Sequence, residues 1–386
     1  RTQQERECVQ QKETMVADIL TGRETVKIFD LGDYWQQKQT DLQIKVMSAS
    51  MARGQSTDYF RIISQSTSLM FTVTLTSVGA LAILEQEMTI GALIAANMLG
   101  SRLIAPFIQL VEHWRTFAQF HKALNRLNAF FKISLDKTEH LLDFPITQGT
   151  IHLQELFFNY DDQQNPAIAG LDGVIGPNGL HLLTGRNGSG KSTLLKLISG
   201  LYLPAKGKVS LDQADLRQFS RAQLHQYIGY LPQKIELFYG SIYENITMGM
   251  EICEQNDVIE IAKQVQLHEL VTQLPMGYET ILQEGGRGVS GGVLQKIALT
   301  RTLIRKPKIL LLDEPGNNLD SDAEQALVTF LSQYAEDHTV IVATHSPVMI
   351  QSATSMVVLE QGKVAIAGAA SMVMEKLATQ KKNNER

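Results

Sequence analysis

Residues 185–192 constrain this chain more than any other segment. They read Gly-Arg-Asn-Gly-Ser-Gly-Lys-Ser, which fits the phosphate-binding loop pattern G-x-x-x-x-G-K-[ST] at every position. The run 181–184 before the loop is typical of a strand, and residues 193–198 after it are typical of the start of a helix. A loop between strand and helix brings backbone N–H groups together at a helix N-terminus, where phosphate binds. We therefore predict a nucleoside triphosphate site on this loop.

Each residue type in the loop has its own task. Glycines let the main chain approach phosphate oxygens, Lys191 supplies a positive charge, and the Ser192 hydroxyl can ligate Mg²⁺. The predicted bound species are ATP and Mg²⁺. The residues expected to contact them here are Gly185, Asn187, Gly188, Ser189, Gly190, Lys191, Ser192 and Thr193.

Two later strands end in polar residues. The aliphatic run 309–312 is typical of a strand buried on both faces, and ligands gather at the carboxyl ends of such strands. Asp313, which follows it, is placed to hold Mg²⁺, and Glu314 to polarise the attacking water as a general base. A further strand, 339–344, is expected to deliver His345 to the same edge, where it would contact the γ-phosphate.

Two signals are weaker. Ser290, Gly291 and Gly292 open a strong helical pattern, so they form a second helix N-terminus that can face an anion, although an ordinary serine cap would look the same. Gln233 follows the strand-like run 227–230.

Length and composition limit the alternatives. The 386 residues suffice for two or more domains, and the net charge of −5 with a pI near 6.0 argues against nucleic acid as a partner. Cys8 and Cys253 form no C-x-x-C, which excludes a disulfide framework and a cysteine-based zinc site. The chain begins at Arg1 without a signal peptide, so we expect it to be part of a longer polypeptide.

The N-terminal third has the composition of a membrane hairpin. Residues 62–84 carry no charge and would span about 35 Å as a helix, enough to cross a hydrocarbon core of about 30 Å. A second apolar stretch, 88–111, is interrupted only by Arg102, and Lys and Arg flank the pair but are absent between them. That charge pattern places both ends in the cytoplasm. The alternative is a pair of buried helices in a soluble bundle. Residues 1–60 predict a helix, a short connector helix after a break near Gly22, and a long helix.

Taken in order, these motifs resemble the ATP-binding cassette (ABC) family along essentially the whole chain. The matching positions are Tyr160 for the aromatic residue that stacks on adenine, residues 185–193 for Walker A, Gln233 for the Q-loop, 290–292 for the signature motif, 309–314 for Walker B, 317–320 for the D-loop and His345 for the switch histidine. The resemblance implies that Glu314, His345 and Gln233 act in catalysis. It also implies nucleotide contacts from Tyr160, Ser290, Gly291, Gly292 and Asp320, and Mg²⁺ ligation by Ser192, Gln233 and Asp313.

The chain as a whole resembles an exporter half-transporter. Residues 1–145 match part of an α-helical membrane domain: the end of its fourth helix, a coupling helix near 22–33, and two spans. Residues 146–386 match an α/β P-loop NTPase domain of ABC type with a helical subdomain. On this resemblance the first three membrane helices and most of the fourth are missing. Residues 284–288 resemble the bacterial type I secretion and peptide-exporter branch.

The implied function is ATP-driven export, with ATP hydrolysed at the composite site of a cassette dimer. The implied partners are a second half-transporter, identical or related, the lipid bilayer and an exported cargo that the sequence does not identify. The implied location is the inner (plasma) membrane, multi-pass, with the nucleotide-binding domain in the cytoplasm. Two alternatives stay open: a soluble or importer-type ABC ATPase, and a decayed remnant that no longer transports.

Two departures from the family pattern stand out. The signature reads Val289-Ser-Gly-Gly-Val293 where the family usually has Leu-Ser-Gly-Gly-Gln, so a polar side chain is missing at position 293. The D-loop carries Asn317 and Asn318 where Ser and Ala are commoner. Because Ser290 and both glycines remain, nucleotide binding in trans is expected to persist, with turnover or coupling affected by Val293.

Overall fold

The computed structural model describes the backbone of residues 2–131, 146, 148–160, 165–250, 253–283, 286 and 288–384. The chain divides into two compact units, Arg1–Asp136 and Lys137–Arg386. The domain boundary expected near residue 145 lies outside the described residues.

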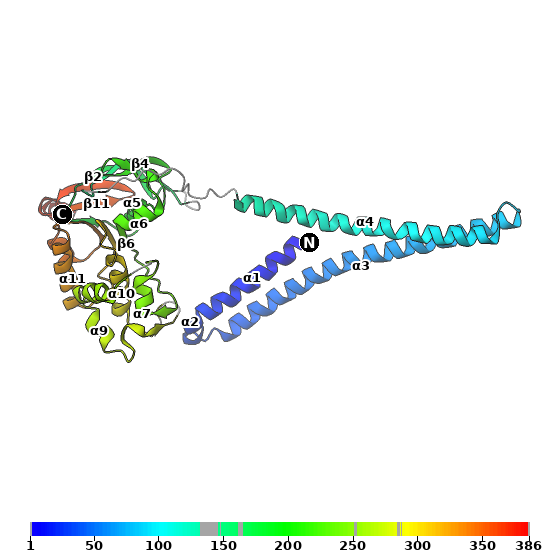
Figure 1. Cartoon of the computed structure of the whole chain (residues 1–386), viewed down its shortest axis with the longest axis horizontal. Coiled ribbons are helices and arrows are strands. Elements are labelled where there is room, and N and C mark those ends of the chain that lie inside the picture. The colour runs from blue at the N-terminus through cyan, green and yellow to red at the C-terminus, as the bar shows by residue number, and fades with distance from the viewer. Residues whose placement is uncertain are drawn as a thin grey trace. The chain divides into compact units, whose positions relative to one another are not determined.

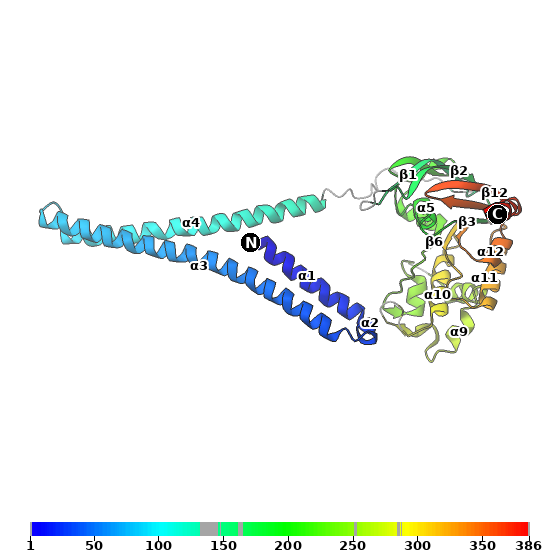
Figure 2. The same cartoon turned by 180° about the vertical axis from the view of Figure 1, so that it is seen from behind.

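The described part of the first unit is built from helices (Figure 1). They are α1 Thr2–Thr21, α2 Arg23–Ile28, α3 Gly32–Leu84 and α4 Ile90–Phe131. The predicted order of helix, short connector helix and long helix is confirmed by the first three of them. Helix α1 packs beside the first half of α3, and α4 returns antiparallel along its second half, as Figures 1 and 2 both show.

Small and polar side chains join α3 to α4. A Cβ on Gly100 would lie 2.7 Å from the Cε1 atom of Phe71, so a side chain at this position would displace that ring. Asn97 Nδ2 donates a hydrogen bond to Thr76 Oγ1 at 3.2 Å. Such contacts are typical of helices that pack within a membrane.

The sequence predicted two membrane spans, and the structure contains one described segment of sufficient length. Gln65–Leu84, within α3, is long and apolar enough to cross a bilayer. The second predicted span, 88–111, contributes the shorter apolar segment Ile90–Gly100, and most side chains from 103 to 116 lie outside the described residues.

The second unit contains two main sheets. One is antiparallel, in the order β2-β1-β4-β5, and was not expected from the sequence; the other is six-stranded, in the order β12-β11-β3-β10-β9-β6, and is parallel except for β12. A short pair, β7-β8, stands apart. The strands are β1 Ile151–Phe158, β2 Ile168–Ile175, β3 Gly179–Thr184, β4 Lys206–Leu211, β5 Ala214–Asp215, β6 Ile228–Leu231, β7 Gly240–Ser241, β8 Ile281–Leu282, β9 Ile309–Asp313, β10 Thr339–Ala343, β11 Ser355–Glu360 and β12 Lys363–Ala369.

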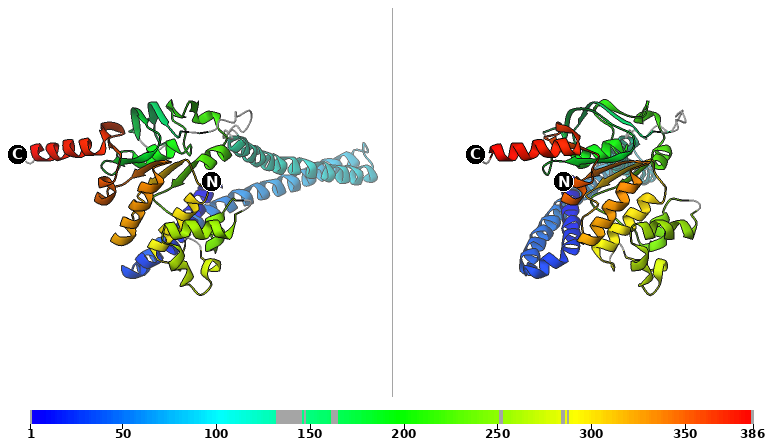
Figure 3. Two further views of the ribbon diagram at one scale, coloured as in Figure 1. Left: turned by 60° about the vertical axis from the view of Figure 1, so that its left-hand side comes forward. Right: turned by 90° about the vertical axis from the view of Figure 1, so that its left-hand side faces the viewer.

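The second unit also contains helices. They are α5 Lys191–Ile198, α6 Arg221–Tyr227, α7 Ile242–Thr247, α8 Gln255–Gln264, α9 His268–Thr272, α10 Gly291–Leu303, α11 Ser321–Tyr334, α12 Pro347–Gln351 and α13 Ala370–Asn384, with 3₁₀ turns at Leu216–Gln218 and Gly277–Glu279. Helices α7 to α10 form the helical subdomain that the family resemblance implied. In Figure 3 the C-terminal helix α13 extends outward from the edge of the sheet at β12.

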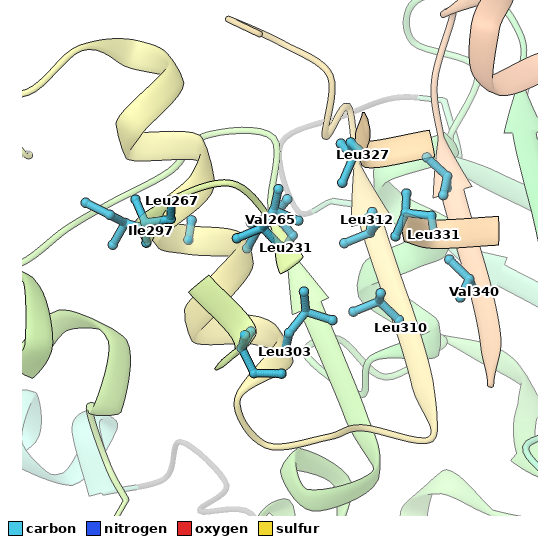
Figure 4. Packing of buried hydrophobic residues seen from close by; sticks show 14 of the residues in the cluster. Leu231, Val265, Leu267, Ile297, Leu303, Leu310, Leu312, Leu327, Leu331 and Val340 are labelled. Atoms are coloured by element: carbon cyan, nitrogen blue, oxygen red, sulfur yellow. The ribbon is translucent and has the colours of Figure 1, made fainter. Parts of the chain in front are cut away.

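The central strands are mostly aliphatic because both of their faces are buried. Side chains of a strand alternate between faces, so Leu310 and Leu312 of β9 point into one core while Ile309 and Leu311 point into the other. Figure 4 shows the first of these cores, where Leu310 and Leu312 pack with side chains of α10 and α11. The polar ends of these buried strands carry the candidate site.

Candidate nucleotide site

The loop between β3 and α5 can be built only from glycine at its ends. A Cβ on Gly185, whose φ is 142°, would lie 2.1 Å from the carbonyl oxygen of Leu359. A Cβ on Gly190, whose φ is 103°, would lie 2.7 Å from the carbonyl oxygen of Ala167. The left-handed conformation and the close neighbours together exclude a side chain, and they hold the loop at the N-terminus of α5.

Lys191 occupies the centre of this loop. Its side chain is 7% exposed, and Nζ donates to the carbonyl oxygens of Gly185 at 2.8 Å and Arg186 at 3.4 Å. It also lies 3.1 Å from Nε2 of His345, which in turn lies 3.9 Å from Oε1 of Glu314. Three residues predicted for the site, from three separate segments, therefore converge on the phosphate loop.

Two features of the loop bear on whether its residues fit a phosphate and Mg²⁺. The Ser189 hydroxyl oxygen is buried and has no hydrogen-bond partner among the described residues, so a ligand oxygen can satisfy it. Ser192 donates a hydrogen bond to Asp313, which is 2% exposed, and burial raises the pKa of that carboxyl against the opposing effect of Ser192, Lys196 and Lys191.

The donor set also suits Mg²⁺ in chemical type. Within the described part of the chain, no group of three His, Cys, Asp or Glu residues could hold a metal ion alone. Mg²⁺ is commonly held by one carboxylate and a hydroxyl together with substrate phosphate oxygens, which is the set that Asp313 and Ser192 offer.

Glu314 has an unusual backbone. Its φ is 51°, in the left-handed region that few non-glycine residues adopt, and its N–H donates to the carbonyl oxygen of Ala343 at 2.8 Å. This hydrogen bond fixes the turn that follows β9 to the end of β10. The side chain of Glu314 is partly exposed, at 16%, and therefore accessible to a water molecule.

Aromatic side chains gather beside α5. Tyr160 packs edge-on against Phe158 at 5.0 Å and against Tyr202 at 5.7 Å between ring centroids, and its hydroxyl lies 3.3 Å from Thr193 Oγ1. Lys196 Nζ lies 5.9 Å from the ring centre of Tyr202. The sequence indicated Tyr160 but not the two rings that support it. The spacing of two residues between Phe158, the last residue of β1, and Tyr160 was the available signal for Phe158. No sequence pattern indicated Tyr202.

The signature and D-loop residues lie at the start of α10 and just before α11. Ser290 is the N-cap of α10 and its side chain makes no capping hydrogen bond, while Gly291 and Gly292 lie against Asn318. Asp320 caps α11 by accepting from the Ala323 N–H at 2.8 Å.

The remaining predicted site residue is Gln233. Gln233 follows β6 by two residues and is exposed, and its side chain has no hydrogen bond to another site residue within the described ranges. Of the secretion-type segment 284–288, residues 284, 285 and 287 lie outside the described residues.

The fold and site define a P-loop nucleotide-binding domain with a helical subdomain. Residues 168–317 match the ABC transporter family. The chain thus carries an ABC transporter ATP-binding domain, preceded by a helical region.

Relatives and solved structures agree with this placement. The chain is 30% identical over 362 residues to the cyclolysin secretion/processing ATP-binding protein CyaB of Bordetella pertussis, covering 93% of this chain and 50% of that protein. It is 32% identical over 290 residues to the alpha-hemolysin translocation ATP-binding protein HlyB of Escherichia coli O157:H7, covering 75% of this chain and 41% of that protein. The chain thus spans about half the length, or less, of these relatives.

The fold matches that of an ABC exporter. A bacterial Atm1-family ABC exporter with ATP bound superposes with a TM-score of 0.83 at 23% identity, over 97% of this chain and 66% of that chain.

Proposed function

We propose that this chain is part of an ABC exporter half-transporter. Two such chains would hydrolyse ATP in a cassette dimer and couple hydrolysis to movement of the membrane helices. The convergence of Lys191, His345 and Glu314 on the phosphate loop carries the proposal. The names of CyaB and HlyB support secretion of a protein cargo as the transported class.

The chemistry follows from the residues around the loop. ATP phosphates would draw Lys191 Nζ away from the carbonyl oxygens it now contacts, and would accept from Ser189 and the loop N–H groups. Glu314 would orient and deprotonate the attacking water, and His345 would donate to the γ-phosphate. Ser192, Asp313 and Gln233 would hold Mg²⁺, which neutralises charge on the phosphate oxygens when bound.

A second chain would complete the site. Ser290, Gly291 and Gly292 present a helix N-terminus whose serine hydroxyl is not used for capping, so it can face the ATP held by the partner. Asp320 would lie at the same interface, and Tyr160 would stack on adenine. We propose two identical chains in the dimer, with a related chain as the alternative.

The N-terminal residues, 1–145, would form part of the membrane domain, and 146–386 the nucleotide-binding domain in the cytoplasm. Two spans, near 62–84 and 88–111, would cross the inner membrane, so the chain would be a multi-pass protein of that membrane. The short helix α2 and its flanks, near 22–33, would serve as the coupling helix that transmits the dimer's closure to the spans.

The test uses the full chain in detergent with Glu314→Gln, and the exposed Glu336→Gln as its control. We expect Glu314→Gln to bind ATP like the wild type, to lose hydrolysis by at least about 100-fold, and to form an ATP-dependent dimer by light scattering. The control should hydrolyse ATP at the wild-type rate. Hydrolysis near the wild-type rate in Glu314→Gln would remove Glu314 from the role of base, and a variant that binds ATP yet stays monomeric would contradict the identical-chain dimer.

A further inference from the structure

A buried amide joins the signature helix to the segment that carries Glu314. Gln295 lies in the first turns of α10 and is 2% exposed. Its Nε2 donates a hydrogen bond to the carbonyl oxygen of Pro315 at 2.9 Å. Pro315 directly follows Glu314, and Gln295 is three residues beyond Gly292. This hydrogen bond therefore connects the signature motif to the segment that carries Glu314.

A second contact reinforces this connection. A Cβ built on Gly291 would lie 3.2 Å from Cβ of Asn318, and one on Gly292 would lie 3.1 Å from the carbonyl oxygen of Asn318. Asn318 has a φ of 65°, a left-handed conformation that asparagine tolerates better than most residues. Asn318 therefore packs directly against Gly291 and Gly292.

The loop that α10 contacts is itself held together. Within residues 314–320, the Asn317 N–H donates to the Glu314 carbonyl at 3.2 Å, and the Leu319 N–H to the Gly316 carbonyl at 3.2 Å. Asp320 then caps α11. Because the loop is bonded internally and contacts α10 at both Pro315 and Asn318, the loop and the first turns of the helix form one body.

We infer that Gln295 is a positioning residue that fastens α10 to loop 314–320, so that the signature motif and Glu314 of one chain move together. The functional meaning rests on the proposed cassette dimer, in which Ser290 to Gly292 engage the partner's ATP while Glu314 serves the chain's own ATP. Engagement of the signature at one nucleotide then sets the position of the base at the other.

The helix provides a matched control for loss of a buried hydrogen bond. Thr300, also in α10, is 0% exposed, and its Oγ1 donates to the Lys296 carbonyl at 2.8 Å within the same helix. Thr300→Val removes this bond without touching the one to Pro315. Gln295→Met keeps nearly the volume of the side chain and removes its donor.

Two measurements on the full chain test the inference. Hydrogen exchange of the nucleotide-free protein reports the order of loop 314–320, and steady-state hydrolysis gives kcat and KM for ATP. In Gln295→Met we expect exchange in this loop to accelerate and kcat to fall, each by about tenfold, with KM within about twofold of wild type. Thr300→Val should show neither change.

Each other outcome has a defined meaning. Wild-type exchange in Gln295→Met overturns the inference, and so does faster exchange without a fall in kcat. Equal changes in exchange and kcat in Gln295→Met and Thr300→Val would show that Gln295 has only a structural role. This result would also overturn the inference. If the wild-type chain does not hydrolyse ATP, the proposed function fails, while the exchange measurement still tests the fastening by Gln295.

Discussion

At the scale of single residues, hydrogen-bond satisfaction separates ligand-facing from structural polar groups. At the carboxyl end of β3, the buried Ser189 hydroxyl has no partner among the described residues, and burial raises the pKa of nearby Asp313. At the other end, His181 uses both ring nitrogens: Nδ1 lies 2.7 Å from Ser355 Oγ and Nε2 lies 3.1 Å from the carbonyl oxygen of Asn178. The Ser189 hydroxyl can therefore accept a ligand as its partner, whereas both ring nitrogens of His181 already have partners.

His181 gives the folded chain a pH dependence. Burial lowers its pKa below the usual value, outweighing the opposing backbone hydrogen bonds. The unfolded chain therefore takes up a proton near pH 6.5 while the folded chain does not, so stability is lost as the pH falls from about 6.5 through the lowered pKa. We expect His181→Gln to be less stable than wild type at pH 8, with a smaller difference at pH 5. Thermal unfolding of the nucleotide-free chain at both pH values measures this, and parallel pH profiles would contradict it.

At the scale of elements, helix α10 contributes side chains to the hydrophobic core and carries the signature motif at its start. Val293 is half-buried and packs with Val289 and Leu294 against the larger of the two cores. The family's polar residue is therefore replaced by one that adds apolar contact at the start of the helix. Stability and polarity at the nucleotide interface compete at this position.

Val293→Gln tests that competition. We expect it to lower the free energy of unfolding by about 1 kcal/mol, because apolar burial is lost, and to raise kcat for ATP severalfold, because a polar side chain returns to the signature. The control is Val289→Thr, which should cost stability without raising kcat. Thermal unfolding and steady-state hydrolysis measure the two effects. An unchanged kcat in Val293→Gln would show that the signature works equally well without a polar side chain there.

At the scale of the whole molecule, the sequence predicted what depends on local pattern. Aliphatic runs followed by Asp313 and by His345 identified β9 and β10, and the break at Gly22 identified the connector helix. Partners fixed by tertiary packing were not predictable. The bond from Gln295 ends on a main-chain carbonyl, which any residue could offer, and β1 pairs with β4 through register that forms only in the folded unit.

The first unit has an apolar surface that its own described helices leave uncovered. Only 6% of the most apolar window of Gln65–Leu84 is buried, and side chains such as Leu69 and Val73 are largely exposed, at 70% and 59%. Exposure of a continuous apolar helix to water is costly, whereas lipid or neighbouring membrane helices would cover it. The proposed membrane location therefore makes a direct prediction.

We expect the wild-type chain, expressed in bacteria, to stay in the membrane pellet after a carbonate wash. A double variant, Leu69→Lys with Val73→Lys, should appear largely in the supernatant or be degraded, because each lysine near the centre of a span costs about 2.5–3.5 kcal/mol. Gln36→Lys, on the same helix but outside the apolar segment, should behave like wild type. Release of the wild-type chain by carbonate would instead favour a soluble ABC ATPase, with the exposed face of Gln65–Leu84 covered by protein rather than lipid.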